Sequence, residues 1–504
     1  MKFNFKIGKA KQTENYEGEK AFVLTPQLEL YTAVATAALS DQFYEKATDK
    51  LERLRKLIAE NDAEFVAKLA VYAREQMYLR SVPLVLTVEL AKMQSGNGIV
   101  GELANRVVQR ADEITELLAY YALANDRKNV KKLNKLSKQL QKGLAEAFNK
   151  FDEYQFAKYN RDAEVKLKDA LFLVHPKAKD EAQQVVFDKI VKDELKAPYT
   201  WEVELSVLGQ QKYDSVELKQ AAFRAKWEEL IFSNKMGYMA TLRNLRNILE
   251  AEVSKEALNK VCEFLGNPKA VVNSKQLPFR FLSAYRELKQ LSNGRVSKVL
   301  NALEEAVLQS AVNIAGYDED TKVVIAADVS GSMQKAISAK SKVQNYDIGL
   351  MLAMLLQSRC QNVITGMFGD KWKVINVPKK NILSNVDEFH RREGEVGYAT
   401  NGYLVINDLL QQKKVVDKVM FFTDCQLWNS NGSENIADLW KRYKKLAPHA
   451  KLYLFDLAGY GNVPLNVQRN DVYLVAGWSD KIFNVLNAIE EGSNAVKMIN
   501  EISL

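Results

Sequence analysis

The stretch KVVIAADVSGSM, residues 322–333, decides how the C-terminal part of this chain folds. Its residues 323–327 form a short apolar run, which is typical of a buried β-strand. Asp328, Ser330 and Ser332 follow at alternate positions, directly after the predicted strand end. Gly331 permits a tight turn that points both hydroxyls at one ion. A carboxylate and two hydroxyls are oxygen donors that suit a hard divalent cation such as Mg²⁺.

Downstream of this loop, apolar runs alternate with helix-like blocks. The runs QNVITGMF (361–368), DKVMFFTD (417–424) and KLYLFDLAG (451–459) are separated by predicted helices near residues 401–412 and 434–446, and another helix is predicted at 347–359. Such alternation predicts a mostly parallel sheet that is covered by helices on both faces. Ligands of these sheets bind at the carboxyl ends of the strands.

Two more oxygen donors complete a candidate metal site. Asp424 ends the run DKVMFFTD, and Thr400 lies in the loop VGYATNG before a helix. Three loops at one sheet edge then converge on one ion. The predicted ligands are Asp328, Ser330, Ser332, Thr400 and Asp424. The alternative interpretation is that the two serines cap a helix and Asp328 is a turn residue.

The choice of threonine is less direct than the choice of carboxylates. Thr365 and Thr423 are also near these loops in the sequence. Both lie inside apolar runs, where a β-branched threonine is an ordinary strand residue. We therefore assign the ligand role to Thr400.

Residues 26–310 are predicted to be mostly helical. In AEFVAKLAVYAREQM (63–77), apolar residues such as Phe65, Leu69 and Tyr72 recur at helical spacing. Many such helices, joined by short polar links, predict a solenoid of HEAT-like helical repeats. The pattern changes near residue 320, after the turn GYDED. We place a helical-repeat domain at residues 20–315 and an α/β domain at residues 320–504.

Composition narrows the class of protein. The chain has 504 residues and three cysteines far apart, Cys262, Cys360 and Cys425, so a disulfide framework is not expected. Neither an apolar signal segment nor a run of 18 apolar residues occurs, so we expect a cytoplasmic protein without membrane spans. Net charge is +8, and residues 1–300 carry 49 Lys+Arg against 40 Asp+Glu. Attraction for polyanions should therefore reside in the helical part.

A basic stretch in the helical part is the candidate nucleic-acid interface. DRKNVKKLNKLSKQLQKGLAEAF (126–148) predicts one helix with lysines on one face and leucines on the other. Its lysines can follow phosphates, and Tyr154, Phe156 and Tyr159 offer stacking surfaces. The alternative is a solvated amphipathic face. The predicted RNA contacts from this helix are Lys128, Lys131, Lys135, Lys138 and Lys142.

Taken together, these features resemble the Ro autoantigen family, in which a TROVE module of helical repeats precedes a von Willebrand factor A (vWA) domain. The likeness covers roughly residues 20 to 500. The vWA part carries it through Asp-Val-Ser-x-Ser-Met at residues 328–333 and through FFTDCQLW at 421–428. The helical part carries it through KYNRDAEVKLKDALFLVHPKAK (158–179), MGYMATLRNLRNI (236–248) and LPFRFLSAYRELK (277–289).

The resemblance implies a monomeric ring with a central basic hole and a metal-ion-dependent adhesion site in the vWA domain. It implies small structured Y-type RNA on the outer surface and single-stranded 3′ ends of misfolded RNA in the hole, with an exoribonuclease as a possible partner. For the outer surface it adds contacts from Lys158, Arg161, Lys166, Lys168 and His175. For the hole it implies Arg243 and Arg246.

Two departures from the family pattern stand out. Ala399-Thr400-Asn401 replaces the usual Gly-Gly-Thr-Asp around the metal threonine, and Glu164-Val165-Lys166 replaces Trp-Ser-His. The second change weakens the case for base-specific Y RNA contacts, whereas phosphate contacts are unaffected.

The sequence therefore supports two hypotheses of function. The first is a non-catalytic RNA-binding protein of the Ro type. The second is a metal-dependent adaptor that captures a carboxylate of a partner protein at the vWA site. An enzyme is not expected, because no acid–base pair, phosphate-binding glycine loop or zinc motif stands out.

Overall fold

The computed structural model describes residues 11–36, 46–94, 96, 98–126, 136–160, 163–337, 341–429, 432 and 435–504. Their contacts divide the chain into two compact units. The α/β unit comprises Met1–Leu54 and Leu265–Met498, and the helical unit comprises Arg55–Phe264 and Ile499–Leu504. The domain boundary that we predict near residue 320 rests on the change in sequence pattern and not on these contacts. It stays a prediction.

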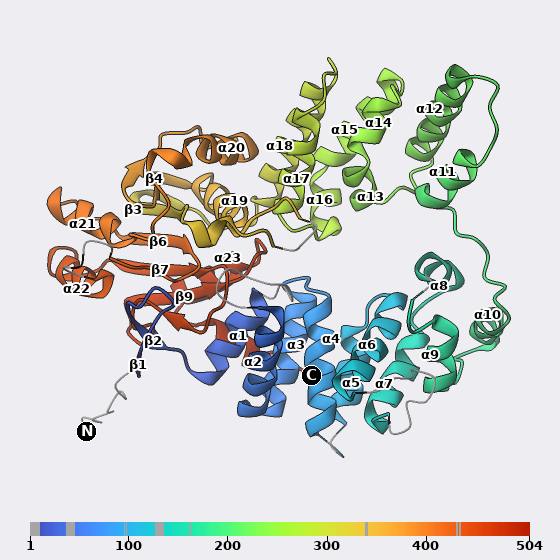
Figure 1. The fold of residues 1–504 in the computed structure, drawn as a ribbon, viewed down its shortest axis with the longest axis horizontal. Coiled ribbons are helices and arrows are strands. Elements are labelled where there is room, and N and C mark those ends of the chain that lie inside the picture. Colours follow the sequence, from blue (N-terminus) through green and yellow to red (C-terminus); the bar gives the residue numbers. More distant parts are fainter. Residues whose placement is uncertain are drawn as a thin grey trace. The chain divides into compact units, whose positions relative to one another are not determined.

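A six-stranded sheet forms the core of the α/β unit (Figure 1). Its order is β5-β4-β3-β6-β7-β9, and every neighbouring pair is parallel except β4 with β5. This confirms the predicted mostly parallel sheet. The strands are β3 (Tyr317–Asp328), β4 (Cys360–Phe368), β5 (Trp372–Val374), β6 (Lys418–Thr423), β7 (Lys451–Asp456) and β9 (Val472–Ala476).

Helices cover both faces of this sheet, because alternate strand residues point to opposite sides. On one face, Phe421 and Leu454 belong to a buried cluster with residues of α21 (Tyr403–Gln411) and α22 (Ile436–Leu446). On the other face, Phe422 stacks on Phe455 with ring centroids 4.3 Å apart. There, α19 (Asn345–Gln357) comes so close that a Cβ on Gly349 would lie 2.8 Å from the Leu457 side chain.

A hairpin near the N-terminus belongs to the same unit, which the sequence pattern did not predict. Strands β1 (Gln12–Glu14) and β2 (Lys20–Val23) pair antiparallel, and β2 also pairs with β8 (Asn462–Val463). Tyr31 of α1 (Pro26–Ala35) extends the attachment, because its hydroxyl donates to the Ala476 carbonyl at 3.0 Å. The remaining helical segments that begin in this unit are α16 (Pro268–Ser274), α17 (Phe279–Lys289), α18 (Val296–Ser310), η2 (Gly331–Gln334), α20 (Ile382–Arg392), η3 (Glu393–Glu395), α23 (Ile482–Glu490) and α24 (Ala495–Asn500).

The helical unit confirms the predicted helical N-terminal region. In its first part, α3, α5, α7 and α9 pack successively in one row, and α4, α6 and α8 pack in a second row. Two of the unit boundaries fall inside its first and last long helices, α2 and α15. The helices are α2 (Ala47–Glu60), α3 (Ala63–Glu75), α4 (Ser81–Met93), α5 (Ile99–Val107), α6 (Ala111–Ala124), α7 (Lys138–Phe148), α8 (Glu153–Tyr159), α9 (Leu167–Val174), α10 (Glu181–Lys192), α11 (Trp201–Gly209), α12 (Val216–Phe232), α13 (Tyr238–Arg243), α14 (Leu245–Glu250) and α15 (Lys255–Gly266). Within the described ranges, no helix combines the length and apolar character that crossing a membrane requires.

Two glycines set the spacing between α5 and α7. A Cβ on Gly143 would lie 2.2 Å from the Gly101 carbonyl oxygen, and a Cβ on Gly101 would lie 3.1 Å from the Gln139 carbonyl oxygen. The two backbones therefore approach more closely than any larger residue permits.

The predicted continuous helix over the basic stretch is wrong. Helix α7 begins at Lys138, because Ser137 has non-helical φ and ψ of −51° and 126° and its side chain accepts from the Leu140 amide as the N-cap. Within α7, Leu140 and Leu144 are buried and Lys138 and Lys142 are exposed, as the amphipathic pattern predicts. Lys128, Lys131 and Lys135 lie outside the described residues.

Replacing Gly143 by alanine tests the close contact of α5 with α7. The added methyl group meets backbone, which moves less readily than a side chain, so we expect a loss of about 1–3 kcal/mol in the free energy of unfolding. Urea unfolding measures it. Gly209→Ala is the control, because a Cβ there meets nothing within 4 Å and should stabilise by up to about 1 kcal/mol. Equal stability of the two variants would contradict the prediction.

Candidate metal centre and nucleic-acid interface

The predicted carboxylates meet at the point where the strand order reverses. From β3 the chain first adds β4 on one side and then returns to add β6 on the other side. Such a reversal leaves a crevice at the carboxyl ends of the two diverging strands. Asp328 is the last residue of β3 and Asp424 directly follows β6, so both lie at this crevice.

Short hydrogen bonds fix the Asp328 carboxylate. Its Oδ1 accepts from the Ser330 amide at 2.9 Å, and its Oδ2 accepts from the Thr423 hydroxyl at 2.6 Å. The Ser330 and Ser332 hydroxyls are 3.2 Å apart. All four side chains are buried. The structure thus brings the loop residues together and adds Thr423, which we had interpreted only as a strand residue.

The backbone around Thr400 ties its loop to the two carboxylate loops. The Gly331 amide donates to the Tyr398 carbonyl at 3.0 Å, and the Trp428 amide donates to the Thr400 carbonyl at 3.0 Å. The Asn401 amide donates to the Gly369 carbonyl, just past β4, at 3.2 Å. These bonds hold Thr400 beside the loops that carry Ser330 and Asp424.

Two buried oxygens at this crevice lack protein donors. Thr400 Oγ1 and Asp424 Oδ2 have no hydrogen-bond partner among the described residues, whereas Asp424 Oδ1 accepts from the Gln426 amide at 3.0 Å. Buried polar atoms normally have partners, so unpaired oxygens at a functional position suggest an ion or water. The donor set therefore fits a hard cation.

The pKa values of the two carboxylates also fit a cation at this position. Burial raises the pKa of Asp328, and repulsion by Asp424 raises it further. The pKa of Asp424 is also raised, chiefly by burial, although hydrogen bonding to Ser332 opposes the rise. A divalent cation would reverse this penalty, because it favours both ionised forms. No cluster of three or more His, Cys, Asp or Glu side chains is arranged for a metal in the described part of the chain, so the hydroxyls would be essential donors.

One group of predicted RNA contacts lies on α7 and at the end of α9. Gln141 of α7 donates to the Leu173 and Val174 carbonyls at 3.2 and 3.3 Å, so α7 lies against the end of α9. The α7–α9 surface carries the exposed residues Lys138, Lys142 and His175. His175 is the left-handed C-cap of α9, with φ of 51°.

Other predicted contacts are partly engaged or lie elsewhere. Lys168 pairs with Asp193 at 3.3 Å, and Arg246 pairs with Glu250 at 2.8 Å. Lys166 is exposed and is the N-cap of α9. Arg161 lies outside the described residues.

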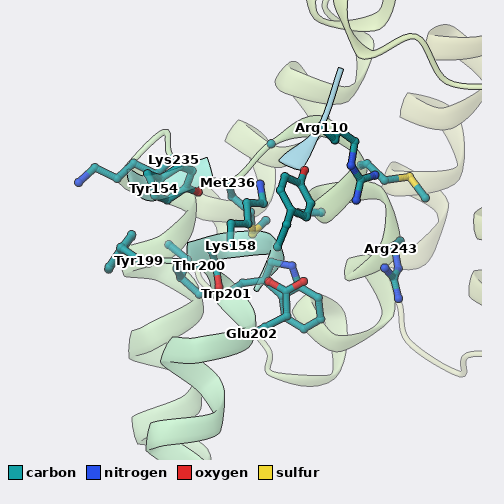
Figure 2. Close-up of a pocket in the computed structure, with 15 residues that line it drawn as sticks. Arg110, Tyr154, Lys158, Tyr199, Thr200, Trp201, Glu202, Lys235, Met236 and Arg243 are labelled. Carbon is teal, nitrogen blue, oxygen red and sulfur yellow. The ribbon is translucent and has the colours of Figure 1, made fainter. Parts of the chain in front are cut away.

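A pocket of about 250 Å³ in the helical unit brings together Lys158 and Arg243, which are 85 positions apart in the sequence (Figure 2). We call it the cation–aromatic pocket. Four basic and four aromatic side chains line it, together with one carboxylate, that of Glu202. The basic residues are Arg110, Lys158, Lys235 and Arg243, and the aromatic residues are Tyr154, Tyr159, Tyr199 and Trp201.

Cations and rings in this pocket are packed against each other. The Arg110 guanidinium lies 4.2 Å from the Tyr159 ring centroid, and Lys158 Nζ lies 5.6 Å from the same centroid. Lys235 Nζ lies 5.0 Å from the Tyr199 centroid. Among the described residues, Lys158, Lys235 and Arg243 form no ion pair with a carboxylate, so their charge is available to an anion.

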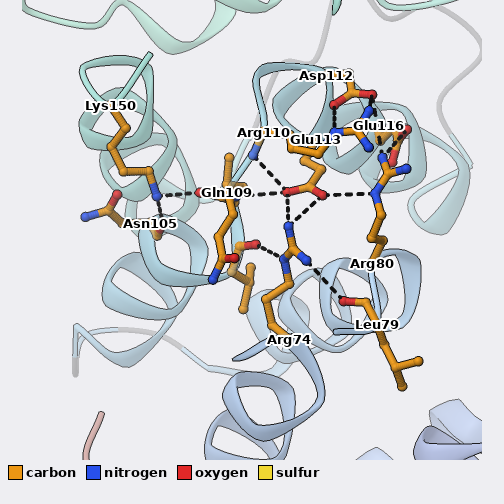
Figure 3. Close-up of polar contacts among 12 residues, drawn as sticks. Arg74, Leu79, Arg80, Asn105, Gln109, Arg110, Asp112, Glu113, Glu116 and Lys150 are labelled. Atoms are coloured by element: carbon orange, nitrogen blue, oxygen red, sulfur yellow. Dashed lines mark hydrogen bonds and ion pairs between the residues drawn. The ribbon is translucent and has the colours of Figure 1, made fainter. Parts of the chain in front are cut away.

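A buried network holds the segment that carries Arg110 (Figure 3). The Glu113 carboxylate accepts from Arg74 Nη2 at 2.9 Å, from Arg80 Nε at 3.2 Å and from the Gln109 amide at 2.8 Å. Arg110 itself donates to both oxygens of Asp112, at 3.0 and 2.6 Å. These hydrogen bonds hold the Arg110 guanidinium at the pocket before any ligand arrives.

Sequence reasoning had missed Arg110, Tyr199, Trp201 and Lys235. They come from three segments, with Tyr199 and Trp201 in the same one, and follow no common periodicity. Lys150, two residues after the basic stretch, has a structural role. Its amine donates to the Asn105 and Val108 carbonyls, and burial lowers its pKa to about 8.

Comparison with known proteins agrees with this architecture. A TROVE domain model matches residues 11–222 and 192–350, and a Ro60 vWA domain model matches residues 322–488. Telomerase protein component 1 of Rattus norvegicus is 24% identical over 53% of this chain, and that of Mus musculus is 23% identical over the same share. The match spans only 13% of the length of these relatives.

A solved structure shows the same fold. The crystal structure of the Deinococcus radiodurans Ro (RSR) protein superposes with a TM-score of 0.58 at 18% identity, covering 93% of this chain and 100% of that one. The TROVE match alone covers more than half of the chain, and the vWA match follows it in the expected order. The chain therefore belongs to the Ro family, in which a TROVE domain precedes a vWA domain.

Proposed function

We propose that this protein is a non-catalytic RNA-binding protein of the Ro type. The cation–aromatic pocket is the observation that carries the proposal. Three cations without ion pairs among the described residues line a space that also presents aromatic side chains. Phosphates bind such cations, and unstacked bases bind such rings.

The pocket favours single-stranded RNA over duplex. Bases within a helix are stacked on each other, so a base reaches an aromatic side chain only when the strand is unpaired. Tyr154 is 43% exposed, which leaves its ring accessible. We assign single-stranded 3′ ends, as in misfolded RNA, to this pocket.

The α7–α9 surface is the proposed site for small structured RNA. Its exposed Lys138, Lys142 and His175 come from two helices in contact. A rigid cationic surface of this kind binds the phosphate backbone and depends little on sequence. Y-type RNA is the ligand that the family resemblance suggests, and the closed ring and an exoribonuclease partner remain predictions from the same source. A cytoplasmic location remains a prediction from the sequence.

We further propose that the crevice between β3 and β6 holds a divalent cation, Mg²⁺ by its donor chemistry. Asp328, Ser330, Ser332, Thr400 and Asp424 are the proposed ligands, directly or through water. Such a cation would offer an open position to a carboxylate of a partner. This supports the second candidate function, a metal-dependent adaptor that recruits protein while the helical unit binds RNA.

Exchange of Arg243 for alanine tests the pocket. We expect about tenfold weaker binding of single-stranded RNA and a salt dependence reduced by about one phosphate contact. Fluorescence anisotropy at several salt concentrations measures both. The family resemblance implied Arg246 beside Arg243, but Arg246 pairs with Glu250 and does not line the pocket, so Arg246→Ala is the matched control and should bind like wild type. Equal losses in both variants would argue against the pocket as the binding site.

Charge reversal at Lys138 and Lys142 tests the α7–α9 surface. The double variant Lys138→Glu/Lys142→Glu should weaken binding of a structured small RNA by tenfold or more, since like charges then face its phosphates, an effect on the order of 1.4 kcal/mol or greater. Binding of a short single strand should change less. The exposed residues Lys212 and Lys219, reversed together, provide the control. Unchanged affinity for structured RNA in the first variant would refute the assignment.

The metal proposal predicts a pH dependence with a defined sign. Because the pKa values of Asp328 and Asp424 are raised, protons compete with the cation, and affinity should increase as pH rises from about 5 to about 8. Calorimetric titration with Mn²⁺ measures it and should also detect proton release. Asp328→Asn should abolish binding, whereas Asp370→Asn, in the loop after β4, should retain it. Wild-type protein that binds no Mn²⁺ at pH 8 would end the proposal.

A further inference from the structure

One charge in the cation–aromatic pocket is unexplained by phosphate binding. Glu202 lines the pocket together with four basic residues, and it is exposed (Figure 2). Within the described ranges its carboxylate forms no ion pair and accepts no hydrogen bond, unlike Glu204 of the same helix, which pairs with Lys226 at 3.1 Å. A carboxylate in this position repels phosphate, so it weakens backbone binding unless it makes a contact of its own.

We propose that Glu202 accepts hydrogen bonds from the edge of one unstacked base and gives the pocket a preference for guanine. The inference rests on the proposed RNA-binding function and deepens it. An ionised carboxylate only accepts hydrogen bonds, and it has two oxygens side by side. Guanine presents two adjacent donors on its pairing edge, N1–H and the N2 amino group, which match those oxygens.

The other bases match less well. Uracil offers a single N3–H between two carbonyl oxygens, which repel a carboxylate. Adenine and cytosine each offer one amino group beside a ring nitrogen that is itself an acceptor. The two carboxylate oxygens therefore meet two donors on guanine but at most one donor on each of the other bases, which favours guanine.

The pocket is suited to one nucleotide in size and rigidity. Its volume of about 250 Å³ lies just below the roughly 300–1,000 Å³ of pockets for drug-sized ligands. Trp201, next to Glu202, stacks on Trp227 with centroids 6.3 Å apart and planes at 21°. Arg110 is held on both sides by Asp112 and Tyr159. Side chains that are already ordered lose little entropy when a base and its phosphate bind.

If Glu202 only stabilises its helix, its removal should not alter base preference in particular. Glu202 is the second residue of α11, where a negative charge stabilises the helix through its dipole. Glu217 is the second residue of α12, is also exposed, and does not line the pocket. Glu202→Gln and Glu217→Gln therefore remove the same charge from equivalent helix positions, and only the first should alter base preference.

The experiment uses the protein of 504 residues and four short single-stranded RNAs. One RNA is uridine throughout, and the other three replace one uridine by guanine, adenine or cytosine. Fluorescence anisotropy gives each affinity. Wild type should bind the guanine RNA roughly tenfold more tightly than the uridine RNA. Glu202→Gln should lose this preference while binding the uridine RNA at least as tightly, since a repulsive charge is gone. Glu217→Gln should retain the wild-type preference.

Each other result overturns the inference in a recognisable way. If wild type binds all four RNAs equally, or if Glu202→Gln keeps the guanine preference, base recognition by Glu202 is wrong while RNA binding stands. If Glu217→Gln loses the preference equally, helix stability is responsible, and thermal unfolding of both variants will show it. If wild type binds none of the RNAs, the proposed function fails together with the inference.

Discussion

Parallel pairing of β3 with β6 is the constraint on which the candidate metal centre depends. Parallel strands end at the same sheet edge, so Asp328 and Asp424 are forced together although they repel each other. The Thr423 hydroxyl reaches Asp328 across 95 positions of sequence. In the described part of the chain, serine and threonine groups and backbone amides contact these two buried carboxylates, and no lysine or arginine does. A pair of acids without a basic partner is a poor structural element and a good cation ligand.

The two units use charge in opposite ways. At the sheet edge, acidic groups are buried, and Thr400 Oγ1 and Asp424 Oδ2 have no hydrogen-bond partner among the described residues. In the helical unit, four basic groups line a pocket beside aromatic rings, and within the described ranges only Arg110 of the four forms an ion pair. Each proposed ligand carries the charge opposite to that of the side chains at its site. The proposed cation site is therefore rich in acidic groups and the proposed polyanion site is rich in basic groups, and the modest net charge of the chain indicates neither.

The sequence predicted the sheet and the carboxylates well, because strand ends and loop motifs are local signals. It placed Thr423 in a strand correctly but did not predict its contact, since a threonine in an apolar run looks the same whether or not its hydroxyl bonds to Asp328. It extended one helix through Ser137, where a side-chain cap outweighs the lysine–leucine pattern. The sequence predicted only some of the residues that line the pocket, because Arg110 and Trp201 come together through packing of distant helices, which no single-sequence periodicity encodes.

The pairing of β2 with β8 has a consequence for how the chain is made. Phe22 is aligned with Val463, and the Asn15 side chain donates to the Leu427 carbonyl. During synthesis Asn15 must wait until its partner, 412 positions later in the sequence, leaves the ribosome. Contacts so distant in sequence form slowly and leave strand edges open in the interval. Nascent chains should therefore depend on chaperones until the last strands of the sheet have emerged.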